Sequence, residues 1–124
     1  MLFRSTLCPP LDYPALLWCL RRSVLALTDS GGIQEEGAAL STPVLVLRNT
    51  TERPELLQAG AGLLVGTDEQ HIVDVGSALL ADTKALTRMR QAINPFGDGQ
   101  TSARVVDVLQ RDLESQDEIS LAAA

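Results

Sequence analysis

The chain has 124 residues, 45% of them hydrophobic, and a formal charge of −6 at pH 7, which suits a single soluble domain with a modest core. Its 10 Lys and Arg residues are scattered, so a nucleic-acid partner is not expected. Apolar runs are too short for a membrane span, and the acidic balance favours a cytoplasmic protein without membrane contact.

Short apolar runs alternate with helical segments along the chain. In chain order, the sequence predicts a helix over 15–22 capped by Asp12, a strand over 24–27, a helix over 33–40 and a strand over 44–47. A short helix then opens at Pro54 and ends at Gly60 and Gly62, before a strand over 63–65. The last predicted elements are a helix capped by Thr67 or Asp68 and helices over 83–92 and 101–114.

The strands are unbroken apolar runs, so each is expected to be buried on both faces. Strand–helix alternation with such strands predicts an α/β, Rossmann-like fold, in which helices cover both faces of a parallel sheet. Leu16, Leu17 and Leu20 give the first helix an apolar side, and two later helices show one at helical spacing. These sides consist of Ile72, Val75, Gly76, Leu79 and Leu80 in one helix, and of Val106, Leu109 and Leu113 in the last.

Several residues that often carry chemistry are given structural interpretations. Cys8 and Cys19 lack metal-site spacing and are interpreted as reduced, partly buried thiols. His71 is the only histidine and lies among polar residues, so it is predicted to be a surface residue rather than a catalyst. Tyr13 and Trp18 are interpreted as packing residues. No metal site is predicted.

The strongest candidate site is the turn after the first strand, which contains Ser30, Gly31 and Gly32. Glycines allow a phosphate to approach the backbone, and the free N–H groups at a helix start favour an anion. Glu36 lies one helical turn further on, where a carboxylate suits ribose hydroxyls. Anion donors beside one carboxylate describe a nucleotide site. A plain helix cap is the alternative interpretation.

A second candidate is the polar loop 48–55, which follows the second strand and contains two Arg and two Thr residues. Such side chains suit phosphate or sugar contacts. Because both candidates follow strands of one parallel sheet, they are expected at the same crevice. A solvated loop without a binding role is the alternative.

These stretches resemble the non-hydrolysing UDP-N-acetylglucosamine 2-epimerases in residues 27–36, 43–48 and 50–55, and the similarity continues in 66–68 and 94–99. The resemblance implies the C-terminal half of a two-domain fold like that of the B-type glycosyltransferases. It covers most of the chain, between Leu11 and Leu109. The expected organisation is a poorly matching start (1–10), a truncated UDP-binding half-domain (11–114) and a disordered tail (115–124).

The resemblance also implies a role for each candidate residue. The diphosphate would contact Ser30, Gly31 and Gly32, and the ribose would contact Glu36. Arg53 would contact the phosphate or sugar side of the ligand. Leu11 and Leu16 would contact the uracil. The family often has an aromatic residue at the position of Leu16, so weaker base stacking is expected here.

The implied reaction interconverts UDP-N-acetylglucosamine and UDP-N-acetylmannosamine by elimination and re-addition of UDP, without a cofactor. No residue here matches the family's acid–base groups, so an N-terminal domain is expected as a partner and the chain alone is expected to be inactive. UDP-N-acetylglucosamine or UDP is the expected ligand, and the resemblance implies a homodimer. A B-type UDP-sugar glycosyltransferase and a non-catalytic nucleotide-binding remnant remain alternatives.

Overall fold

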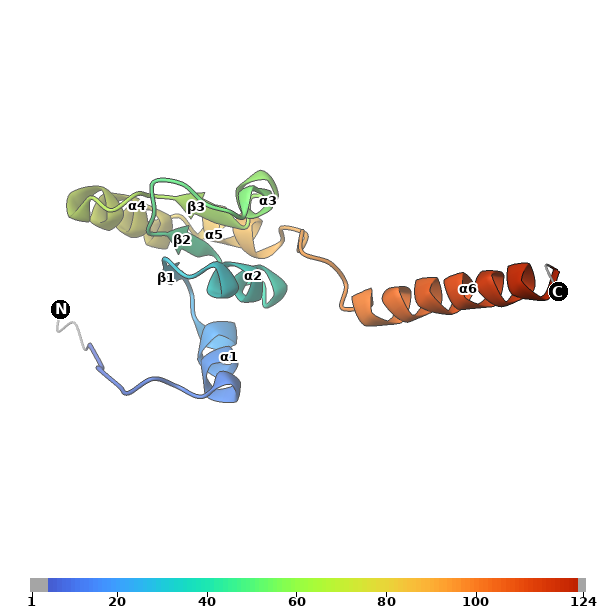
Figure 1. The fold of residues 1–124 in the computed structure, drawn as a ribbon. Coiled ribbons are helices and arrows are strands. Elements are labelled where there is room, and N and C mark those ends of the chain that lie inside the picture. Colours follow the sequence, from blue (N-terminus) through green and yellow to red (C-terminus); the bar gives the residue numbers. More distant parts are fainter. Residues whose placement is uncertain (1–4, 123–124) are drawn as a thin grey trace.

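The computed structural model describes residues 5–122, and the burial of side chains as far as residue 114. Three short strands, β1 (Ala26–Thr28), β2 (Val44–Val46) and β3 (Gly62–Leu64), form one parallel sheet in the order β1-β2-β3. Figure 1 shows this sheet at the centre of an α/β unit. The predicted fold class is therefore confirmed.

Six helices accompany the sheet within the described residues. They are α1 (Tyr13–Arg22), α2 (Gly31–Ala39), α3 (Pro54–Gln58), α4 (Glu69–Ala81), α5 (Thr83–Arg90) and α6 (Thr101–Ala122). Four of them begin behind a capping side chain that accepts a hydrogen bond from a backbone N–H three residues later. These caps are Asp12, Ser30, Asp68 and Asp82.

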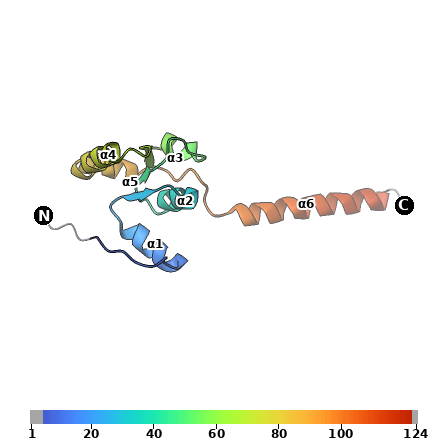
Figure 2. The same cartoon turned by 60° about the vertical axis from the view of Figure 1, so that its left-hand side comes forward.

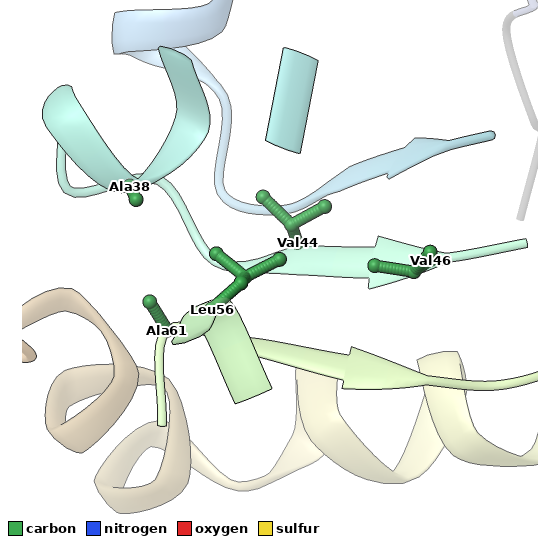
Figure 3. Packing of buried hydrophobic residues seen from close by; sticks show 5 residues of the cluster. All are labelled: Ala38, Val44, Val46, Leu56 and Ala61. Atoms are coloured by element: carbon green, nitrogen blue, oxygen red, sulfur yellow. The ribbon is translucent and has the colours of Figure 1, made fainter. Parts of the chain in front are cut away.

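The helices cover both faces of the sheet because the side chains of β2 alternate between the faces. Val44 and Val46 pack against α2 and α3 through Ala38 and Leu56, as Figure 3 shows. Leu45 packs on the opposite face, in a cluster with Leu79 of α4 and with Leu86 and Met89 of α5. The core is thus two thin apolar layers on either side of β2.

All three strands were expected to be buried on both faces, but only the central strand is. The side chains of β2 are 0% exposed, whereas Leu27 of β1 is 50% exposed and Leu63 of β3 is 43% exposed. Strands β1 and β3 are the two edges of the sheet, so each has a single neighbour among the described strands. The first strand also begins two residues later than predicted, which leaves Val24 outside it and exposed.

Helix α1 is attached to the rest of the fold by hydrogen bonds at its C-terminal end. The buried Thr42 hydroxyl donates to the Leu20 carbonyl at 2.8 Å. The Arg90 guanidinium, at the end of α5, donates to the carbonyls of Ser23 and Val24 at 2.9 and 3.2 Å. These bonds link the end of α1 to the segment after α2 and to α5.

Several side chains that were predicted to pack are exposed instead. Trp18 and Cys19 of α1 and Cys8 before it are exposed, and both thiols are free. Leu80 of α4 is also exposed, because it lies outside the face that Ile72, Val75, Gly76 and Leu79 turn towards the sheet.

Helix α6 projects away from the sheet in both views (Figures 1 and 2). The apolar residues of its predicted packing side, Val106, Leu109 and Leu113, are at least half exposed. The helix continues to Ala122, through most of the segment where a disordered tail was predicted, and residues 123 and 124 lie outside the described residues. No helix among residues 5–122 is long and apolar enough to cross a membrane.

Candidate functional site

Three connecting segments meet at the carboxyl edge of the sheet. The turn that contains Ser30, Gly31 and Gly32, called the Gly turn below, follows β1. The polar loop 48–53 follows β2, and Gly66 follows β3. Because the strands are parallel, all three connections leave from the same edge. In open α/β sheets this edge is where ligands bind.

The Gly turn opens directly into α2. Ser30 caps the helix, although its Oγ lies 3.5 Å from the Ile33 nitrogen, and its own N–H donates to Thr28 Oγ1 at 3.0 Å. A side chain at Gly32 would meet only the Ser30 hydroxyl within 4 Å, so the surface beside this glycine is open. The first N–H groups of α2 therefore lie at an accessible surface that favours an anion.

The loop after β2 packs on α2. The sequence predicts this proximity, because the loop and the Gly turn both follow strands of one parallel sheet. The Thr51 hydroxyl donates to Gln34 Oε1 at 2.7 Å and accepts from the Arg53 N–H at 3.0 Å. Gln34 is fully buried, and its Nε2 has no hydrogen-bond partner within the described part of the chain. This chain of contacts anchors the loop and sets the position of Arg53.

The Arg53 side chain lies beside the Gly turn. Its Nε donates to Glu35, one turn into α2, and this hydrogen bond is the main reason why the pKa of Arg53 is raised. Its Nη2 lies 3.8 Å from the position that a β-carbon of Gly31 would occupy. The structure thus brings together Arg53 and the glycine turn, which are 22 positions apart in the sequence.

Glu52, which was not a predicted site residue, also reaches this point. Its Oε2 accepts from Arg48 Nη1 at 2.5 Å, and its Oε1 lies 2.8 Å from the same β-carbon position of Gly31. The pKa of the Glu52 carboxyl is lowered, chiefly by a hydrogen bond from its own backbone N–H. Desolvation opposes this effect, and the charges of Arg48 and Arg53 add smaller contributions that lower the pKa.

Glu36 lies on the side of α2 that meets the start of α1. The Tyr13 hydroxyl lies near the Glu36 carboxylate, and hydrogen bonding to that carboxylate, followed by its negative charge, raises the pKa of Tyr13 above its ordinary value of 10.0. Leu11 precedes α1 and is partly exposed, and Leu16 lies half-buried within α1. The predicted uracil and ribose residues therefore belong to neighbouring elements, with Tyr13 as the contact between them.

An open cavity of about 420 Å³ lies next to this site, at the carboxyl ends of β2 and β3. It is lined by Arg48, Asn49, Leu64, Val65, Gly66, Thr67, Asp68 and His71. His71 is exposed, as predicted, yet it faces this cavity, which its place in a polar run does not reveal. Arg48 is shared between the cavity and the Glu52 ion pair.

Sequence reasoning missed four contributors to the site, namely Tyr13, Gln34, Glu35 and Glu52. A signal was available for Glu52, which follows Arg48 by four residues and directly precedes Arg53. No comparable signal marks Tyr13 or Gln34, because their partners lie on other elements. No group of three or more potential metal-ligating side chains was found within the described residues.

Comparisons with known proteins agree on one family. A family model described as UDP-N-acetylglucosamine 2-epimerase matches residues 2–110. The UDP-N-acetylglucosamine 2-epimerase of Escherichia coli K12 is 48% identical over 101 residues, which is 82% of this chain and 27% of that protein. A probable UDP-N-acetylglucosamine 2-epimerase of Ralstonia solanacearum is 50% identical over 101 residues, which is again 82% of this chain and 27% of that protein.

Solved structures give the same result. MnaA of S. aureus, solved with UDP, matches with a TM-score of 0.81 and 41% identity, covering 85% of this chain and 29% of that one. The UDP-GlcNAc 2-epimerase of Neisseria meningitidis, bound to UDP-GlcNAc, matches with a TM-score of 0.78 and 40% identity, covering 82% of this chain and 28% of that one. This chain therefore spans little more than a quarter of the length of these relatives.

Proposed function

Because the chain belongs to the UDP-N-acetylglucosamine 2-epimerase family, we propose that it is the UDP-binding part of an isomerase that interconverts UDP-N-acetylglucosamine and UDP-N-acetylmannosamine. Two relatives of the same fold are described with UDP or UDP-GlcNAc bound, which supports this ligand. The proposal extends to a cytoplasmic location, in line with the acidic composition.

The observation that carries the proposal is the meeting of Arg53 with the start of α2. A diphosphate beside Ser30, Gly31 and Gly32 would receive backbone N–H groups and the positive end of the helix dipole. Arg53 Nη2 lies 3.8 Å from the β-carbon position of Gly31, so its guanidinium can add charge-assisted hydrogen bonds after a small movement.

The remaining contacts follow along the same surface. Glu36, whose carboxylate raises the pKa of the neighbouring Tyr13 hydroxyl, would accept hydrogen bonds from the ribose hydroxyls. Leu11 and Leu16 would contact the uracil from the start of α1. This assignment puts base, ribose and diphosphate in one line from α1 to the Gly turn.

We propose that this chain binds the departing UDP and that residues outside it carry out the proton transfers. Epimerisation through elimination breaks the bond from the sugar C1 to the UDP oxygen and removes a proton from C2. The positive groups at the Gly turn would stabilise the departing UDP. We assign the proton transfers to residues of a further, N-terminal domain, and we propose that a homodimer is the assembled form. No cofactor is required by this reaction, since C2 is deprotonated and reprotonated without net oxidation.

Calorimetric titration of the 124-residue chain with UDP tests the proposal. We expect saturable binding that Arg53→Ala and Glu36→Ala each weaken by about tenfold, because each removes hydrogen bonds involving a charged group. Arg88→Ala, which removes a cation from the exposed side of α5, serves as the matched control and should leave the affinity unchanged. A folded chain that fails to bind UDP, or binds it equally well in all variants, would contradict the proposal.

A further inference from the structure

The carboxylate of Glu52 occupies part of the surface where the diphosphate is proposed to bind. Its Oε1 lies 2.8 Å from the β-carbon position of Gly31, and Arg53 Nη2 lies 3.8 Å from the same position. An acidic oxygen and a guanidinium therefore both lie beside the first residue of α2. Gly31 permits this approach because it has no side chain.

The cations of the site are engaged by carboxylates of the chain itself. Arg48 pairs with Glu52, and Arg53 pairs with Glu35. Glu52 is the ion-pair partner of Arg48, and the nearby charge of Arg53 also favours its ionised form. A nucleotide diphosphate would use the same cations.

The ion pair of Glu52 is readily exchanged. The Arg48 and Glu52 side chains are 42% and 48% exposed, and exposed pairs of this kind contribute little to stability because water screens them. Glu52 lies in the loop 48–53 rather than in a helix or strand, so its side chain can swing away without disturbing the core. A stronger, multiply charged anion can therefore take its place.

We propose that Glu52 is a built-in competitor for the diphosphate: its carboxylate occupies the anion position beside Gly31 until a diphosphate displaces it and takes over its partner Arg48, next to Arg53. Glu52 thereby sets the affinity for UDP, excludes weakly charged anions and assists the release of the nucleotide. This role rests on the proposed diphosphate site. It nevertheless makes a separate prediction, because replacing Glu52 should tighten ligand binding, whereas replacing Arg53 or Glu36 should weaken it.

The test compares Glu52→Gln with Glu55→Gln by calorimetric titration of the whole chain. Both variants remove one negative charge near Arg53, but Glu55 lies in the first turn of α3 rather than against Gly31. The ligands are UDP and inorganic pyrophosphate, which carries the diphosphate without the nucleoside. We expect Glu52→Gln to tighten both ligands by about threefold to fivefold, the effect of removing one exposed ion-pair competitor, and Glu55→Gln to have a clearly smaller effect.

The outcomes separate this inference from the proposed function. Tighter pyrophosphate binding by Glu52→Gln without any UDP binding would support the competitor role and reject the UDP assignment. Unchanged or weaker pyrophosphate binding by Glu52→Gln, or none in either protein, would overturn the inference, because Glu52 would then only position the arginines or the anion site would not exist. Equal tightening by Glu55→Gln would also overturn it, because the effect would come from net charge.

Discussion

At the scale of single residues, the contact between Tyr13 and Glu36 joins two elements that the sequence does not connect. Tyr13 was interpreted as a packing residue, yet its side chain is exposed and the Glu36 carboxylate raises the pKa of its hydroxyl. A ribose at the proposed position would therefore bind next to the Tyr13 hydroxyl.

This contact has a measurable consequence, because Tyr13 is the only tyrosine of the chain. A bond to a carboxylate favours the neutral phenol, so the pKa of Tyr13 is raised above 10.0 in the folded protein. The stabilisation is fully present below the pKa of the unfolded chain and is lost as pH rises through the higher folded value. Tyrosinate absorbance should therefore appear at higher pH in the folded protein than in the urea-unfolded chain.

Substitution separates this contact from general effects of charge. Glu36→Gln removes the carboxylate charge and should lower the absorbance midpoint towards 10.0. Glu35→Gln, one position earlier, should leave the midpoint where it is, because Glu35 pairs with Arg53 instead. A midpoint that responds equally to both variants would show that Tyr13 senses only the net charge of α2.

At the scale of elements, α2 rests against β2 at Gly37. A β-carbon at Gly37 would lie 2.5 Å from Val44 Cγ2 and 3.3 Å from the Thr42 carbonyl oxygen. The helix lies close to the strand because this position has no side chain. Gly76 of α4 is also a buried helical glycine, but a β-carbon there would make an ordinary contact of 3.7 Å with Leu45 Cδ1.

These two glycines form a matched pair of substitutions. We expect Gly37→Ala to lower the free energy of unfolding by about 1–3 kcal/mol, because the added methyl overpacks the interface with β2. Gly76→Ala should raise it by about 0.5–1 kcal/mol, because alanine is the better helix former and the methyl has room. Urea unfolding followed by circular dichroism measures both values. Equal changes in the two variants would contradict the packing described at Gly37.

At the scale of the whole molecule, α6 is separate from the core. The helix points away from the sheet (Figures 1 and 2). The side chains of residues 101–114 are all exposed. It is joined to the core through the turn segment 94–99, where Phe96 packs partly against the layer of α2 and α3. Stability should therefore come from residues 11–96.

Removal of α6 tests this separation. A chain that ends at Gln100 should unfold at nearly the same temperature as the whole chain. Its free energy of unfolding should differ by no more than about 0.5 kcal/mol, the range typical of changes at exposed positions. The helical circular dichroism signal should fall while UDP affinity is retained. A large loss of thermal stability would show that α6 packs on the core in solution.

Much of the fold follows from local signals. The capping residues Asp12 and Asp68, the proline at the start of α3 and the glycine at 66 mark the ends of elements through short-range hydrogen bonds and backbone geometry. The parallel sheet follows from the alternation of these elements, and with it the position of the Gly turn and the polar loop at one edge. The ends of the elements need only neighbouring residues to be decided, and the sheet is inferred from the order of these elements.

Other features depend on segments that are distant in the sequence. The exposure of Leu27 is decided by the position of β1 at the edge of the sheet, and the surface positions of Cys19 and Trp18 by the side of α1 that faces α2. The carboxylate partners of Arg48 and Arg53 are decided by the docking of their loop on α2 through Thr51 and Gln34. Sequence patterns predict which residue types reach the edge of the sheet, but only the packed chain determines which charges meet there, because ion pairs form between whichever side chains the fold brings within reach.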